Sequence, residues 1–242
     1  MTIDKKELNI EQEINLTSGE NMWEFSNYGD NEKSKIRCSD GPCGVRFVED
    51  VTQANDTKKS DATVFLCPTS SASTFNPELM YKLGVGLGLE AKHYNVDLLL
   101  TPGINIKRTP LNGRNFEYYS EDPYLTGILA SALVNGIQEE KVGVCVKHLC
   151  CNNQETYRYT NSSIVDERAL NEIYLYAFRL LVEKSNPLAV MTSYNKMDNI
   201  YISENKDLLN KMRKDYNFRG LFISDWGGIN DPVKAFKAGL NI

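Results

Sequence analysis

One aspartate lies at a position where side chains that carry chemistry are often found. Asp225 directly follows the apolar run at residues 221–224 and precedes Trp226 and two glycines, so it lies at the carboxyl end of an expected strand, beside an aromatic side chain. An aromatic face is a surface on which the apolar face of a sugar ring stacks. An aspartate at this position can equally cap the next helix, and the local sequence favours neither interpretation.

A second group of polar residues follows another apolar run. Lys147 and His148 end the run at residues 143–148, and the loop CCNNQETYR adds amides, Glu155 and Arg158. A ligand rich in hydroxyl groups needs many fixed donors and acceptors, and this loop supplies both. A lone histidine is more often a structural group, so its polar neighbours are what favour a binding site.

Three further loops carry polar residues that suit the same kind of ligand. Arg114 lies in PLNGRNFEYYSEDP, and its planar guanidinium group can hold two oxygen atoms at once. Asp40 lies in SDGPCGVR and Tyr194 in MTSYN. The alternatives are an arginine–carboxylate network with Glu117 and Asp122 that braces a long loop, and a core tyrosine that reaches the surface.

The elements that must position these residues follow an alternating pattern. Short runs of β-branched and aliphatic residues alternate with longer segments of helical periodicity, which predicts an α/β fold with a mostly parallel sheet. The expected strands are residues 36–38, 63–67, 96–100, 143–148, 188–193, 221–224 and a strand start at 239–242. The expected helices are residues 76–94, 124–139, 167–184 and 207–216. About seven strands make a TIM-like (β/α) barrel that is incomplete at its C-terminus, because a closed barrel has eight.

The expected domain organisation is simple. Residues 1–35 are a polar helical lead-in, and residues 36–242 form one barrel domain. Polar residues gather where barrel strands end and the following loops begin, and that face of such a barrel carries the active site.

Composition excludes several classes of function. The chain of 242 residues has a net charge of −5 and lacks the basic excess that nucleic-acid binding requires. No apolar stretch approaches the length of a membrane span, and the first residues have no apolar leader segment, so no membrane partner and a cytoplasmic location are expected. Six cysteines without paired metal-ligand spacing indicate reduced, mostly buried thiols and no metal site.

In order along the chain, these motifs resemble the barrel domain of glycoside hydrolase family 3, in its bacterial β-glucosidase branch. The resemblance spans about residues 36–242. It depends on SDGPCGVR, GRNFEYYSEDP, KHLCCNNQETYR, MTSYN and FRGLFISDWGG, and the GRNFE–SEDP block followed by SDWG is the most specific part.

The resemblance implies a function and a set of site residues. The implied reaction is hydrolysis of terminal non-reducing β-linked glycosides with retention, by double displacement, on a small carbohydrate substrate such as a β-glucoside and without a metal or cofactor. Asp225, the aspartate of SDW, would be the nucleophile, and Trp226 would lie against a sugar ring. The residues implied to bind the sugar hydroxyl groups are Asp40, Arg114, Lys147, His148, Arg158 and Tyr194.

The sequence also departs from the family pattern. The family's last strand and helix, and the C-terminal sandwich domain that usually carries the acid/base glutamate, have no counterpart here, so no acid/base residue is assigned and Glu155 is a weak candidate. The alternative function is therefore a catalytically incomplete sugar-binding fragment or remnant. A phosphate-handling barrel is disfavoured because no late glycine-rich phosphate loop is present. Asn241 stands where aspartate is usual and is expected to weaken a structural contact.

Overall fold

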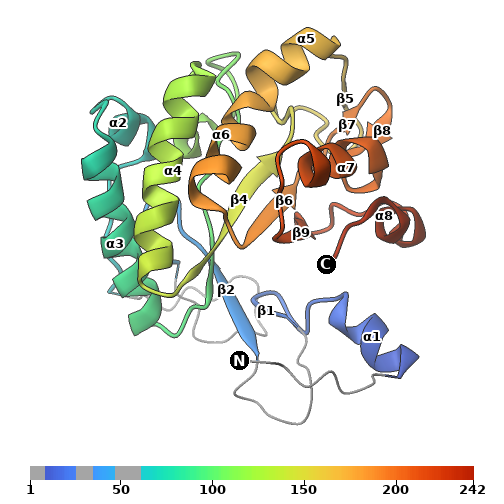
Figure 1. Cartoon of the computed structure of the whole chain (residues 1–242), viewed down its shortest axis with the longest axis horizontal. Helices are drawn as coiled ribbons and strands as arrows, with labels where there is room; N and C mark the ends of the chain where they lie inside the picture. The colour runs from blue at the N-terminus through green and yellow to red at the C-terminus, as the bar shows by residue number, and fades with distance from the viewer. Residues whose placement is uncertain (1–8, 26–34, 47–60) are drawn as a thin grey trace.

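The computed structural model describes residues 9–25, 35–46 and 61–242. Its centre is a curled six-stranded sheet with the strand order β1-β2-β3-β4-β6-β9 (Figure 1). The strands are β1 (Glu24–Phe25), β2 (Ile36–Asp40), β3 (Leu98–Leu100), β4 (Gly143–Leu149), β6 (Ala189–Thr192) and β9 (Leu221–Ser224). All neighbouring pairs run parallel except β1 and β2. The expected α/β fold with an incomplete TIM-like barrel is confirmed.

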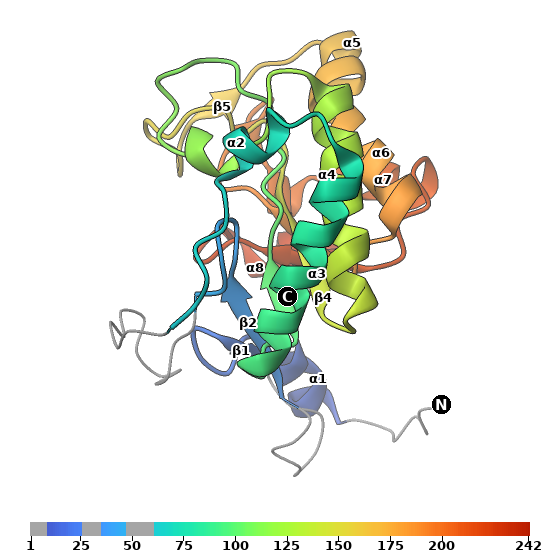
Figure 2. The same cartoon turned by 90° about the vertical axis from the view of Figure 1, so that its left-hand side faces the viewer.

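Three helices cover one side of the sheet, and Figure 2 shows the first two lying along each other. They are α3 (Pro77–His93), α4 (Pro123–Glu139) and α6 (Tyr176–Ser185). Proline occupies the first turn of α3 and α4, where its missing N–H costs nothing, and the side chains of Asn76 and Asp122 cap these two helices. Asp122 therefore caps a helix and does not belong to an arginine network.

The remaining elements lie between and after these helices. They are α1 (Ile10–Leu16), α2 (Pro68–Ala72), α5 (Glu167–Ala169), a π-helical turn (Leu170–Tyr174), α7 (Lys206–Lys214), α8 (Pro232–Ala238) and two 3₁₀ turns (Asn115–Glu117 and Ile202–Glu204). A small separate sheet contains β5 (Ser162–Ser163), β7 (Lys196–Met197) and β8 (Ile200–Tyr201). Among the described residues, none of the helices is both long enough and apolar enough to cross a bilayer.

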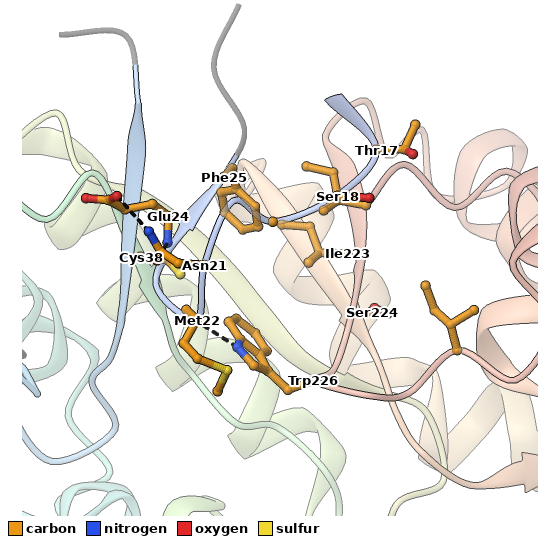
Figure 3. Close-up of a pocket in the computed structure, with 13 residues that line it drawn as sticks. Thr17, Ser18, Asn21, Met22, Glu24, Phe25, Cys38, Ile223, Ser224 and Trp226 are labelled. Carbon is orange, nitrogen blue, oxygen red and sulfur yellow. Dashed lines mark hydrogen bonds between the residues drawn. The ribbon is translucent and has the colours of Figure 1, made fainter. Parts of the chain in front are cut away.

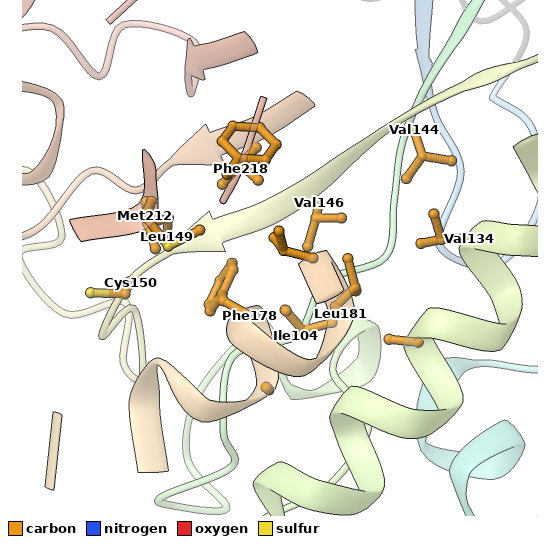
Figure 4. Packing of buried hydrophobic residues seen from close by; sticks show 14 of the residues in the cluster. Ile104, Val134, Val144, Val146, Leu149, Cys150, Phe178, Leu181, Met212 and Phe218 are labelled. Carbon is orange, nitrogen blue, oxygen red and sulfur yellow. The ribbon is translucent and has the colours of Figure 1, made fainter. Parts of the chain in front are cut away.

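The main core lies between the sheet and its helices. Figure 4 shows Val144, Val146 and Leu149 of β4 among side chains of α4 and α6, such as Val134 and Phe178. All five are at most 2% exposed. A parallel strand that is buried on both faces has a nearly continuous apolar sequence, which explains why β4 could be predicted from the sequence.

The strand predicted at residues 63–67 is wrong. This segment is extended but joins no sheet, and its Val64 is 89% exposed. The start of β2 is already paired with β1 at Ile36 and Arg37, and the segment instead bonds to the loop after β2, where Phe65 N donates to Cys43 O at 2.8 Å. It also passes close to Gly44, where an added Cβ would lie 2.2 Å from the carbonyl oxygen of Thr63.

One edge of the described sheet differs from the expected pattern, and the other is close to it. Residues 1–35 were expected to be a helical lead-in; their described part contains helix α1 but also β1, and residues 1–8 and 26–34 lie outside the described residues. At the other edge, the backbone N–H groups of Asn241 and Ile242 donate to the carbonyl oxygen of Phe222, and Ser224 N donates to Ile242 O at 2.7 Å. These residues therefore extend the sheet beside β9, as a strand start at 239–242 would.

Candidate active site

A pocket of about 310 Å³ lies at the carboxyl ends of the parallel strands. Asp40 ends β2, Lys147 lies near the end of β4, Tyr194 lies two residues after β6, and Asp225 directly follows β9. Because parallel strands present these ends along one edge of the sheet, side chains far apart in sequence converge there. The described residues that line the pocket are Met22, Trp23, Asp40, Arg46, Leu100, Arg114, Lys147, Arg158, Met191, Tyr194, Asp225 and Trp226.

Asp225 is the most contacted acidic group of the pocket. Its Oδ1 accepts one hydrogen bond from the Tyr194 hydroxyl group and one from the backbone N–H of Trp226, both at 2.8 Å. Its Oδ2 lies 3.6 Å from an Arg114 nitrogen and 3.5 Å from His148 Nε2. Helix α8 is capped by Asp231, so Asp225 is not the helix cap that the local sequence also allowed.

Burial and hydrogen bonding act on Asp225 in opposite directions. Removal from water raises the pKa of the Asp225 carboxyl group, and this is the largest influence on it. The hydrogen bond from Tyr194 and the positive charges of Arg114 and Lys147 lower the pKa but do not fully cancel the effect of burial. Asp225 is thus a buried carboxyl group whose negative charge depends on these named neighbours.

A network of buried charges forms the wall beside Asp225. Lys147, with a side chain only 5% exposed, lies 3.3 Å from Asp40 and 3.7 Å from Glu117. Arg114 also pairs with Glu117 through its Nε. Burial lowers the pKa of Lys147, but the two carboxylates outweigh it, so the pKa lies above its ordinary value and the ammonium group stays charged. Glu117 is thus ion-paired with two cations, which agrees with the alternative that it belongs to an arginine–carboxylate network.

His148 lies behind Asp225 and does not line the pocket. Its side chain is 1% exposed, and burial together with the charges of Arg114 and Lys147 lowers the pKa of its imidazole well below the ordinary value. The ring is therefore neutral near pH 7. Its Nδ1 lies 3.1 Å from the hydroxyl group of Tyr118.

Arg158 borders the pocket above the ring of Tyr194. Its guanidinium carbon lies 4.3 Å from the centre of that ring, a cation–π contact. It also donates to Glu155 at 3.0 Å and to the hydroxyl group of Tyr159. Glu155 is thus engaged in an ion pair with Arg158 and is not among the described residues that line the pocket.

Trp226 is held by the N-terminal segment. Its indole N–H donates to the carbonyl oxygen of Met22 at 2.9 Å (Figure 3). Its ring centre lies 6.3 Å from that of Trp23. Arg46 in turn lies over the Trp23 ring. Sequence reasoning missed Met22 and Trp23 as pocket residues; the signal that could have found them is the short apolar stretch MWEF inside an otherwise polar region.

A neighbouring pocket of about 310 Å³ lies on the other side of this contact, and Figure 3 shows Phe25 and Ile223 facing it. Both are buried. Met22 and Trp226 each line both pockets, so this bonded pair lies between them.

The chain matches a family model and named relatives over nearly its whole length. The model of the glycosyl hydrolase family 3 N-terminal domain matches residues 13–240. A thermostable β-glucosidase B from Acetivibrio thermocellus is 41% identical over 239 residues, which are 98% of this chain and 32% of the relative. An exo-α-(1→6)-L-arabinopyranosidase from Bifidobacterium longum is 39% identical, over 98% of this chain and 32% of the relative.

Solved structures agree with this result. The structure of β-glucosidase 3B from Thermotoga neapolitana in complex with glucose superposes with a TM-score of 0.88 at 40% sequence identity, over 96% of this chain and 34% of that one. The β-glucosidase of Kluyveromyces marxianus in complex with glucose superposes with a TM-score of 0.89 at 38% identity, over 98% of this chain and 28% of that one. The chain spans about a third of the length of these relatives, and it belongs to glycosyl hydrolase family 3.

Proposed function

We propose that this chain is the sugar-binding and nucleophile-bearing part of a retaining β-glucosidase-like glycosidase, with Asp225 as the nucleophile. The observation that carries the proposal is the environment of Asp225. Two donors fix Oδ1, while two other buried atoms of pocket-lining residues, Asp225 Oδ2 and an Nη atom of Arg114, have no hydrogen-bond partner in the described structure. Buried polar atoms without partners at a pocket indicate that a ligand supplies the missing hydrogen bonds.

The chemistry of retention fits this arrangement. A retaining glycosidase needs an ionised carboxylate that attacks the anomeric carbon and forms a covalent glycosyl intermediate. The donors at Oδ1 hold the carboxylate in one rotamer and leave Oδ2 as the attacking atom. Lys147, Arg114 and Asp40 then supply the charged donors and acceptor that a ring with several hydroxyl groups requires.

The acid/base group is proposed to come from outside these 242 residues. Retention requires a second carboxyl group at about 5–5.5 Å from the nucleophile. Among the described residues that line the pocket, the carboxyl group besides Asp225 belongs to Asp40, and it is already ion-paired with Lys147 and Arg46. The relatives named above are about three times as long as this chain. The acid/base group is therefore expected in a region that corresponds to the other two thirds of those relatives.

Covalent trapping tests the nucleophile without needing that group. In a 2-deoxy-2-fluoro-β-glucoside of dinitrophenol, the dinitrophenolate leaves without protonation as the nucleophile bonds to C1. The reagent therefore labels a nucleophile even where general acid catalysis is absent. We expect the chain to gain the mass of one fluoroglucosyl group, on the peptide that contains Asp225. The matched control is Asp225→Asn, which keeps the shape of the side chain and should remain unlabelled.

The outcomes separate the proposed function from its alternative. Labelling at another residue, or none when glucose binds with measurable heat in calorimetry, would contradict the nucleophile role and favour a sugar-binding remnant. If glucose also fails to bind, the sugar site itself is disproved. A parallel experiment with the corresponding fluorinated arabinopyranoside compares the two sugars that the names of the relatives contain.

A further inference from the structure

Tyr118 is a buried residue whose hydroxyl group faces the imidazole behind Asp225. It is fully buried, and its oxygen lies 3.1 Å from His148 Nδ1. The amide of Asn152 donates to the same oxygen at 3.4 Å. On its opposite side, His148 Nε2 lies 3.5 Å from Asp225 Oδ2. A chain of polar atoms therefore runs from Asn152 through Tyr118 and His148 to the carboxylate.

The order of donors and acceptors along this chain follows from the chemistry of its members. The amide nitrogen of Asn152 can only donate, so the oxygen of Tyr118 accepts from it and keeps its own proton available. A neutral imidazole has one donor nitrogen and one acceptor nitrogen. The low pKa of His148 keeps its ring neutral, so Nδ1 can accept the Tyr118 proton and Nε2 then carries the ring proton.

The opposite tautomer is disfavoured at the other end of the chain. With the proton on Nδ1, the lone pair of Nε2 would face the negatively charged Oδ2 of Asp225 in a buried site. Two lone pairs at 3.5 Å in a region of low polarity repel one another, whereas an N–H group at this distance is attracted to the negatively charged carboxylate. Both ends of the chain thus select the same tautomer.

The surrounding backbone holds both rings in place. Asn105 exchanges two hydrogen bonds with the backbone of His148, at 2.8 and 2.9 Å. The Tyr118 ring fits against Gly103, where an added Cβ would lie 2.9 Å from the ring. The carbonyl oxygen of Tyr118 accepts a hydrogen bond from the side chain of Thr69. These contacts leave neither ring free to turn away from the other.

We propose that Tyr118 is a positioning residue: its hydroxyl group donates to His148 Nδ1 and fixes the neutral imidazole with its proton on Nε2, directed at Oδ2 of Asp225. The meaning of this arrangement for catalysis rests on the proposed function, because it supplies a donor to the atom that would attack the sugar. The tautomer itself does not rest on it, and it can be measured without any sugar.

The experiment reads the protonation of the imidazole directly. The chain has two histidines, so His93→Gln on the exposed surface of α3 leaves His148 as the one imidazole. Long-range ¹H–¹⁵N spectra of ¹⁵N-histidine-labelled H93Q protein at neutral pH should show a lone-pair shift for Nδ1 and an N–H shift for Nε2. The Tyr118 hydroxyl proton should give a nuclear Overhauser contact to the His148 Hε1 proton.

Two further variants identify the residue responsible. In H93Q combined with Tyr118→Phe, the two nitrogen shifts should move towards each other, because the acceptor at Nδ1 has lost its donor and the other tautomer becomes populated. The matched control is Tyr119→Phe, which removes the hydroxyl group of the adjacent buried tyrosine and should leave both shifts unchanged.

Three results would overturn the proposal. They are a proton on Nδ1 in the H93Q protein, a Tyr118→Phe spectrum identical to that of Tyr119→Phe, and a Tyr118 hydroxyl proton without contact to His148. The first and third are measured in a chain with Tyr118 intact, so they decide the matter even if Tyr118→Phe does not fold.

Discussion

Replacing Glu117 by glutamine removes one charge from the buried network and nearly nothing else. The side chain of Glu117 is 3% exposed and contacts both Arg114 and Lys147. Breaking a buried ion pair by removing one partner typically costs about 3–5 kcal/mol, because the remaining charge loses its compensation. Here Lys147 keeps Asp40 at 3.3 Å and Arg114 keeps Asp225 at 3.6 Å, so we expect a loss at the low end of this range, about 3 kcal/mol.

The measurement is urea unfolding followed by fluorescence of the two tryptophans. Glu172→Gln is the matched control, because it makes the same chemical change in an ion pair with Arg168 whose two side chains are 61% and 83% exposed. That surface pair contributes under about 0.5 kcal/mol. If the two variants lose the same free energy of unfolding to within about 0.5 kcal/mol, then the buried network does not stabilise the fold and the reasoning is refuted.

Three other predictions concern separate parts of the molecule. Gly84→Ala should lower the free energy of unfolding, measured in urea, by about 3 kcal/mol, because its Cβ would lie 2.3 Å from a backbone oxygen of α4. The control is Gly86→Ala, two residues along the same helix, whose Cβ meets only a side chain at 3.3 Å and should change stability by under about 1 kcal/mol. Equal effects of the two substitutions would contradict the close packing of α3 against α4. Asn241→Asp should stabilise the chain by about 1 kcal/mol, since Oδ1 already accepts from Arg213 and a charged acceptor strengthens that bond; a loss of stability would refute it. Tyr194→Phe should raise the pKa of Asp225 further, because it removes a donor that lowers it, so ionisation in a ¹³C-carboxyl titration should require a higher pH; an unchanged titration would show that the hydrogen bond is weak.

Much of the fold could be predicted because burial leaves a direct trace in the sequence. Strands β4, β6 and β9 are buried on both faces and appear as apolar runs, and proline with a capping side chain marks the starts of α3 and α4. Residues 63–67 have the same composition as a strand, but composition does not reveal whether the start of a neighbouring strand is already paired. That depends on β1, a two-residue strand too short to recognise from its own sequence.

The candidate site was predictable to a different extent. Asp225 and Lys147 follow from the rule that polar residues at the ends of parallel strands gather on one face. Asn241 departs from the family pattern, yet its amide oxygen accepts hydrogen bonds from Phe222 N and Arg213. The contact with Arg213 is therefore present, and what it lacks is the negative charge of an aspartate. Trp23 and Tyr118 could not be assigned, because their place at the site depends on contacts across the tertiary structure and not on a local pattern.

The hydrogen bond from Trp226 to the carbonyl oxygen of Met22 means that the aromatic wall of the pocket and its charged groups are held by different parts of the chain. The position of Trp226 depends on residues 22 and 23, whereas the charged groups come from the carboxyl ends of the parallel strands and the loops that follow them. Mutations in the N-terminal segment can therefore widen or narrow the cavity without altering Asp225 or its donors. Under the proposed function, differences in the sugars that fit would arise from residues far in sequence from Asp225.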